Sequence, residues 1–218
     1  MNSRDRFRET MRYGTPDRVP YFEEGIRDDV LRAWCRQGLR RKSEFEARFR
    51  HDRREEIHPD LEPLPRLKQW PSSRADLDRM RRRLNPEDAR RFSRKWQNRA
   101  TELAQREHVV MLHVQRGLFL SMGVEGWGRF AEVIGLLVRD PLLVHDALMI
   151  QGEFAARLVD RVLRTVQVDA AFFSEPIAEN RGPLVSPKMY SEIVLPGYDP
   201  LLSVLKRHGV EVIVFVSW

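Results

Sequence analysis

Several short apolar runs of the sequence are followed by side chains that could carry acid–base and anion-binding chemistry. Paired carboxylates can exchange protons with a substrate. An arginine can hold a carboxylate through two parallel hydrogen bonds. We predict Asp60 and Glu175 as catalytic carboxylates and Arg116 as the anion clamp. The predicted substrate-binding residues, which follow or end such runs, are Glu23, Glu24, Arg27, His113, Gln115, Arg116 and Ser174.

Histidine and cysteine spacing predicts no metal site. A single cysteine, Cys35, excludes an internal disulfide and a Cys-rich zinc site. His51 and His58 flank a charged stretch without a third ligand. His108 and His113 are five residues apart and face opposite sides of a strand. We therefore expect no cofactor and no metal.

The apolar runs are too short for helices and are expected to form strands. Their nearly continuous apolar character is typical of strands buried on both faces of a parallel sheet. In such sheets, ligand sites collect at the C-terminal ends of the strands. The expected strands are Val19–Phe22, Glu55–His58 (the weakest), Val109–Val114, Ala170–Phe173 and Val210–Val216.

The helices between these runs are expected to begin at a capping residue followed by proline. Proline is tolerated at the first helical position, and Asp, Asn or Ser before it can cap the free amide groups. The predicted helices run from Asn85-Pro86 to Arg106, from Asp140-Pro141 to Val166, from Ser186-Pro187 to an end at Pro196, and from Asp199-Pro200 to His208-Gly209. Alternating strands and helices indicate an α/β fold, either a doubly wound sheet or a (β/α)8 barrel. No G-x-G-x-x-G loop follows a strand, which counts against a nucleotide-binding open sheet.

The composition is typical of a globular chain. It has 218 residues, of which 42% are hydrophobic, and no apolar run of membrane-spanning length or apolar N-terminal signal segment. We therefore expect no membrane partner and a cytoplasmic location. The net charge of +6 arises in residues 40–107, which carry 20 basic and 13 acidic groups. Because acidic residues interrupt this basic segment, nucleic-acid binding ranks only third among the functions considered.

Four blocks of the sequence resemble the uroporphyrinogen decarboxylase superfamily, in the family's order. They are S-R-D-R-F-R-E-T-M-R-Y-G-T-P-D-R-V-P (3–20), V-D-A-A-F-F-S-E-P-I-A (168–178), G-P-L-V-S-P-K-M-Y-S-E-I-V-L-P (182–196) and H-G-V-E-V-I-V-F-V (208–216). The resemblance implies one (β/α)8 barrel domain over residues 1–218, represented by its first five strands, with residues 61–107 matched only in outline. It implies either a cofactor-free decarboxylase, a lyase of porphyrin synthesis, or a methyltransferase that passes methyl groups between corrinoid proteins and thiols, often through zinc.

The sequence departs from both branches of that family. The decarboxylases carry M-R-Q-A-G-R after the first strand, where Phe22–Arg27 here read F-E-E-G-I-R, and these acids would repel a polycarboxylate. The zinc methyltransferases place H-x-C where Phe215–Ser217 stand here, and phenylalanine cannot bind zinc. We expect a decarboxylase or methyl-transfer enzyme with a small-molecule substrate, a tetrapyrrole or corrinoid protein included, and leave a homodimer open. The alternative is an inactive or partner-requiring barrel fragment.

Overall fold

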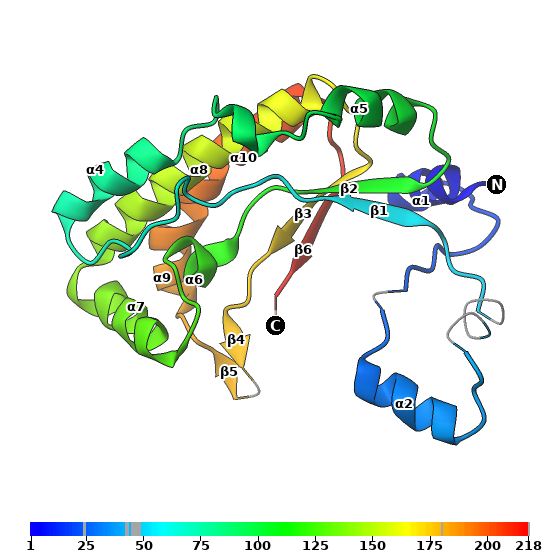
Figure 1. Ribbon diagram of the computed structural model, residues 1–218, viewed down its shortest axis with the longest axis horizontal. Coiled ribbons are helices and arrows are strands. Elements are labelled where there is room, and N and C mark those ends of the chain that lie inside the picture. Colours follow the sequence, from blue (N-terminus) through cyan, green and yellow to red (C-terminus); the bar gives the residue numbers. More distant parts are fainter. Residues whose placement is uncertain (24, 42–43, 45–48, 180, 218) are drawn as a thin grey trace. The chain divides into compact units, whose positions relative to one another are not determined.

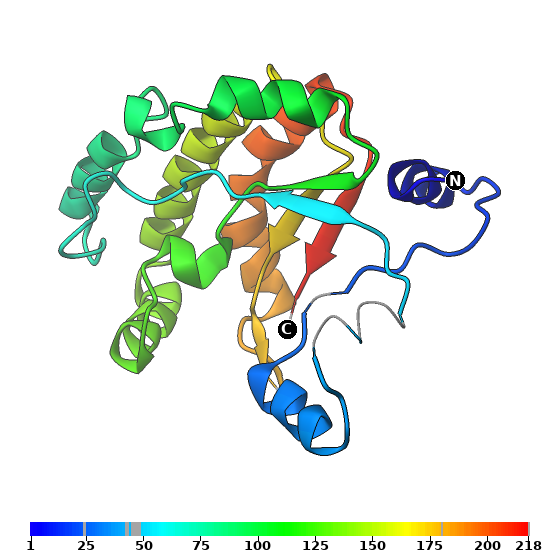
Figure 2. The ribbon, with the colours of Figure 1, turned by 45° about the vertical axis from the view of Figure 1, so that its right-hand side comes forward.

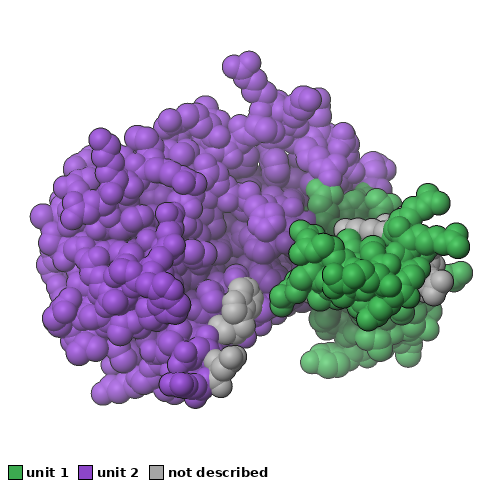
Figure 3. All heavy atoms as spheres, turned by 60° about the horizontal axis from the view of Figure 1, so that its bottom comes forward, with its two compact units in different colours: residues 1–55, 106–110 green, residues 56–105, 111–218 purple. Residues whose placement is uncertain are grey.

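The computed structural model describes residues 1–218 except 24, 42–43, 45–48, 180 and 218. The chain divides into unit 1, residues 1–55 with 106–110, and unit 2, residues 56–105 with 111–218, which Figure 3 distinguishes by colour. The strands of the main sheet are β1 (Arg54–Ile57), β2 (Val109–His113), β3 (Ala170–Ser174) and β6 (Ile213–Val216). They form a parallel sheet in the order β1–β2–β3–β6, flanked by helices (Figure 1). This confirms the α/β class, whereas the barrel stays a prediction.

Unit 1 contains the helices α1 (Ser3–Met11) and α2 (Asp28–Arg36). Its packing centres on the buried guanidinium of Arg6 in α1. This group pairs with Asp17, with Nε 2.6 Å from the carboxylate, and also with the buried Asp52. Phe7, also buried in α1, meets the ring of Phe22 edge-on at 5.9 Å between centroids. The loop after α1 is therefore held to its own helix by charge pairing and one aromatic contact.

Val19–Phe22, predicted as the first strand, lies outside the sheet, and that prediction was wrong. Pro20 has no amide hydrogen to donate to a neighbouring strand, which disfavours a sheet position. Tyr21 instead bonds to Asp52: its carbonyl accepts from the Asp52 amide at 2.6 Å, and its own amide donates to the Asp52 carboxylate at 2.9 Å. Val19 is 77% exposed, so the run is not a buried one. The other four predicted strands form, within a few residues of the expected bounds.

The helical elements described in unit 2 are α4 (Arg74–Arg83), η1 (Ala89–Arg91), α5 (Trp96–Ala104), α6 (Gly117–Ser121), α7 (Trp127–Arg139), α8 (Pro141–Leu163), α9 (Pro187–Met189), η2 (Tyr190–Val194), η3 (Leu195–Tyr198) and α10 (Asp199–Arg207). Unit 2 also contains a short antiparallel pair of strands, β4 (Ala178–Glu179) and β5 (Gly182–Pro183). Helix α8 packs against α10, and the two lie side by side in Figures 1 and 2. Asp140 caps α8 as predicted, because its side chain accepts from the Leu143 amide at 3.1 Å. Gly152 lets α8 approach η3 closely: a Cβ there would lie 1.9 Å from the carbonyl oxygen of Gly197.

Two predicted helices differ from the structure. The helix expected from Asn85 to Arg106 is broken into η1 and α5. Only a single turn follows Asn85, whose carbonyl accepts from the Asp88 amide at 3.5 Å and from Nε of Arg91 at 2.7 Å. Pro196 does not end the helix that begins at Pro187; the chain passes through the π segment η2 and the 3₁₀ segment η3 into α10. These pitch changes accommodate a proline that has no amide hydrogen.

Strand β6 is less buried than its apolar sequence predicts. All four residues of β6 pair with β3, from Ile213 opposite Ala171 to Val216 opposite Ser174. Ile213 and Phe215 are nevertheless 46% and 47% exposed, because β6 is the outermost strand in the order of the sheet. Among the described residues, no helix is long and apolar enough to cross a membrane.

Candidate active site

A cleft of about 300 Å³ opens in unit 2 where β1, β2 and β3 end. This volume lies at the lower limit typical of small-molecule sites. The side chains predicted from the sequence that line it are Asp60, His113, Gln115, Arg116 and Ser174. The structure therefore brings together five predicted site residues from the ends of three strands.

The other predicted site residues lie elsewhere. Glu23 and Arg27 belong to unit 1, where Glu23 accepts from the Tyr21 hydroxyl at 2.7 Å and Arg27 pairs with Asp29 at 2.8 Å. Glu24 falls outside the described residues. Glu175 belongs to unit 2 but is fully buried and does not reach the cleft.

Arg116 is the cation of the cleft. Its Nη2 atom lies 2.5 Å from a carboxylate oxygen of Glu62, and its guanidinium lies 5.6 Å from the centre of the Trp70 ring. Burial lowers the pKa of Arg116, and the charge of Glu62 opposes this effect. Its Nη1 atom is buried and has no hydrogen-bond partner within the part of the chain that the structure describes. This donor is hydrogen-bonding capacity that no described group of the protein uses.

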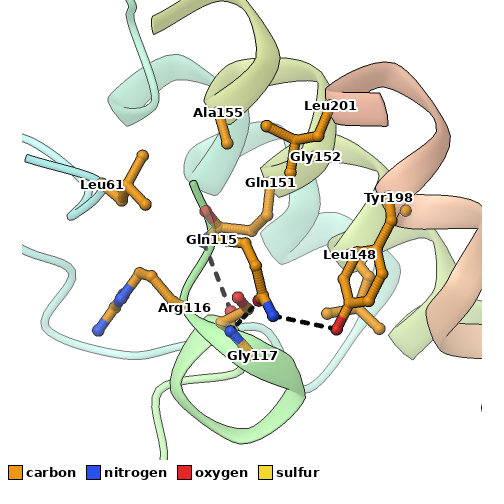
Figure 4. Close-up of a pocket in the computed structure, with 12 residues that line it drawn as sticks. Leu61, Gln115, Arg116, Gly117, Leu148, Gln151, Gly152, Ala155, Tyr198 and Leu201 are labelled. Atoms are coloured by element: carbon orange, nitrogen blue, oxygen red, sulfur yellow. Dashed lines mark hydrogen bonds between the residues drawn. The ribbon is translucent and has the colours of Figure 1, made fainter. Parts of the chain in front are cut away.

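The turn after β2 holds Arg116 and Gln115 in place. Gly117 has a φ of +75°, and a Cβ there would lie 2.8 Å from the carbonyl oxygen of Ser174, so this turn requires glycine. The amide nitrogen of Gln115 donates to the same carbonyl at 3.2 Å and to the Tyr198 hydroxyl at 3.3 Å, and its oxygen accepts from the Gly117 amide. Figure 4 shows Gln115 turned toward Tyr198 and Arg116 directed the other way. The turn thus directs the guanidinium of Arg116 and the side-chain amide of Gln115 to opposite sides.

Glu175 lies behind this turn as a buried acid. Its Oε1 accepts from the Leu118 amide at 2.8 Å, and its Oε2 accepts from the Tyr198 hydroxyl. Burial raises the pKa of Glu175 to about 7, although the hydrogen bonds from Leu118 and Gln115 act in the opposite direction. The hydroxyl of Tyr190 is also buried, and burial together with the nearby charge of Glu175 raises its pKa. The small cavity drawn in Figure 4, next to Gln115 and Tyr198, has a volume of only about 20 Å³, room for a single water molecule.

The loop that carries Asp60 is fixed by Arg91, which lies in the basic segment 40–107. The side chain of Arg91 is buried. Its Nη1 donates to the carbonyls of Asp60 at 2.6 Å and Glu62 at 2.9 Å, and its guanidinium lies 4.4 Å from the centre of the Phe154 ring. Arg91 therefore positions the cleft and is not available to a phosphate backbone.

His58 was predicted to lack further ligands, and the structure corrects this prediction. His58 and His113 stack with their ring centroids 4.0 Å apart, and both point a nitrogen at the carboxylate of Glu56. Phe172 supports the His113 ring at 4.4 Å. Sequence spacing missed the group because its members come from two different strands. The signal was that His58 and His113 both stand at strand ends.

Comparisons of the chain with protein-family models, with curated proteins and with solved structures find no match.

Proposed function

We propose that the chain is an enzyme that acts on a small carboxylate substrate in the cleft of unit 2, with decarboxylation as its leading reaction. The observation that supports this proposal is the meeting of Asp60, His113, Gln115, Arg116 and Ser174 in one cleft where parallel strands end. Strand ends of parallel sheets are the usual place for such sites. The resemblance to the uroporphyrinogen decarboxylase superfamily leads to the same class of reaction.

In this proposal Arg116 binds the substrate carboxylate through its unpartnered Nη1 donor. When the bond to the carboxylate carbon breaks, its electron pair stays on the neighbouring carbon, which must then take up a proton. Asp60 lines the cleft, and its carboxyl group is a side chain that can exchange protons. Glu175 is buried, so we assign it a positioning role: it holds the Leu118 amide and thereby the turn that carries Arg116.

The charge of the cleft restricts its substrate. Among the described residues that line the cleft, two carboxylates, Asp60 and Glu62, accompany one guanidinium, that of Arg116. Like charges at such short range would repel a substrate with several carboxylates. We therefore favour a substrate with one carboxylate over a porphyrin precursor, and methyl transfer is the second reaction within the same family.

The test uses purified full-length chain and a panel of pyruvate, citrate and uroporphyrin, with binding followed by ligand-observed NMR. We expect pyruvate to bind, and Arg116→Gln to weaken this binding at least tenfold, because the variant loses the charged donor. Arg164→Gln, which changes an exposed arginine paired with Asp160, is the matched control and should bind as the original chain does. Pyruvate binding that survives in Arg116→Gln would contradict the proposal, as would preferential binding of uroporphyrin.

The alternative of a partner-requiring fragment has one observation in its favour. Ile213 and Phe215 of β6 are about half exposed on the outermost strand, and such edges promote association. Sedimentation velocity together with thermal unfolding decides between a self-sufficient enzyme and a fragment that requires a partner. A single monodisperse species with cooperative unfolding supports the self-sufficient enzyme, and concentration-dependent aggregation supports the fragment.

A further inference from the structure

Three side chains with metal-binding atoms converge in unit 2. Glu56 lies in β1, His58 follows the end of β1, and His113 is the last residue of β2. The Nε2 atom of His113 is 2.9 Å from Oε2 of Glu56, and the Nε2 atom of His58 is 3.3 Å from the same oxygen. One ligand atom from each residue lies within 4.8 Å of the others. Two imidazoles and one carboxylate thus face a common point.

We propose that Glu56, His58 and His113 bind a divalent transition-metal ion, with Zn²⁺ as the reference ion. Zinc bonds to imidazole nitrogen and carboxylate oxygen are about 2.0–2.2 Å long, so the ligand atoms of a tetrahedral site lie about 3.3–3.5 Å apart. The separations of 2.9 and 3.3 Å are close to this value. Small side-chain rotations are therefore enough to admit an ion. Three protein ligands of this kind are typical of sites that keep a position open for water or substrate.

The surroundings both hold the group and leave it accessible. The side chains of His113 and Glu56 are 18% and 27% exposed, and Phe172 packs on the His113 ring. His58 is 62% exposed and completes the group from the solvent side. His58 and His113 also line the cleft that contains Arg116. The open position of the ion would therefore face the same space as the proposed anion clamp.

The competing explanation is that the Glu56 carboxylate simply accepts hydrogen bonds from the two imidazoles. The chain provides a matched control for this reading. His108 lies 3.1 Å from a carboxylate oxygen of Glu55, which is the same pair of residue types. Among the described residues, no third ligand joins this pair in a group like that of Glu56. A His–Glu hydrogen bond alone would give both places the same weak affinity for metal.

The experiment titrates chelator-treated full-length chain with Co²⁺, followed by its visible absorption, and then displaces Co²⁺ with Zn²⁺ in a calorimeter. We expect one ion per chain. His58→Ala and His113→Ala should each weaken binding at least tenfold, since loss of even an outer partner of a metal ligand costs that much. His108→Ala should bind within twofold of the original chain. His58 is exposed, so its removal changes the ligand set without disturbing the core, and circular dichroism verifies that each variant is folded.

Absence of Co²⁺ binding, or binding that both His58→Ala and His113→Ala retain, would overturn the proposal. Equal losses in His108→Ala and His58→Ala would also overturn it, because they would show scattered surface binding. The measurement needs no substrate. Arg116→Gln should keep the full metal affinity, so failure of the proposed reaction and failure of this metal site are distinguishable.

Discussion

The buried carboxyl of Glu175 predicts an unusual dependence of stability on pH. Burial raises its pKa in the folded chain to about 7, compared with an ordinary value of 4.5 that applies once the chain unfolds. Between these values the folded state binds more protons than the unfolded state. The free energy of unfolding therefore falls as the pH rises through this window. The stabilising contribution of the protonated Glu175 carboxyl is complete only below pH 4.5.

The size of this effect follows from the two pKa values. One pKa unit corresponds to about 1.4 kcal/mol, so the complete transition amounts to about 3 kcal/mol. Between pH 5 and pH 8 the loss is about 2–3 kcal/mol, because a small part has already occurred at pH 5. Glu175→Gln keeps the shape of the side chain but cannot ionise. It should therefore be close to the original chain in stability at pH 5 and more stable by about 2–3 kcal/mol at pH 8.

Urea unfolding at pH 5 and pH 8, followed by far-ultraviolet circular dichroism, measures this difference. Other titrating groups cancel when the variant is compared with the original chain at each pH. Glu192→Gln is the control, because that side chain is 64% exposed and should give the same difference at both pH values. If Glu175→Gln also gave a difference that does not change with pH, the assignment of a neutral buried acid at position 175 would be refuted.

Two further substitutions test how the cleft and the helices are held. Arg91→Ala should cost about 3–5 kcal/mol in urea unfolding, because it removes the hydrogen bonds that a buried guanidinium donates to the partly buried carbonyls of Asn85, Asp60 and Glu62. Arg90→Ala, its exposed neighbour, should cost under about 1 kcal/mol, and equal losses in the two would contradict the buried role of Arg91. Gly152→Ala should lower the thermal midpoint markedly, by at least about 2 kcal/mol in stability, since its Cβ would meet a backbone carbonyl at 1.9 Å. Gly128→Ala in α7 should be neutral or stabilising, because no atom lies within 4 Å of the position its Cβ would take. If Gly152→Ala unfolded at the same temperature as Gly128→Ala, the close approach of α8 and η3 would be disproved.

Local signals in the sequence predict much of the fold. The Asp140-Pro141 pair identifies the start of α8, and the capping hydrogen bond to the Leu143 amide is the physical reason. Continuous apolar runs identify β2 and β3, which are buried. The same kind of run misleads at Val19–Phe22, where Pro20 removes a ladder donor and Asp52 supplies a different partner for Tyr21.

The sequence predicts only those residues of the candidate site that directly follow or end a recognisable strand. Asp60, Arg116 and Ser174 were identified because parallel strands bring their ends to one edge, and these residues do line one cleft. The meeting of His58 with His113 depends on which strands are neighbours, and a single sequence does not specify strand order. The burial of Arg91 is equally hidden, because an arginine that serves backbone carbonyls has the same local sequence pattern as one on a solvated helix.

Arg91 also has a consequence for how the protein can change over evolution. Its guanidinium binds the carbonyls of Asp60 and Glu62 on one side and those of Arg83 and Asn85 on the other. One side chain therefore closes the base of the excursion that runs from Glu62 to Arg83. The entropy of closing a loop grows only slowly with its length. Insertions and deletions in its loop residues 67–69 should thus be tolerated while the cleft edge keeps its place, whereas Trp70 and α4, which contact Arg116 and α8, should be retained together with Arg91.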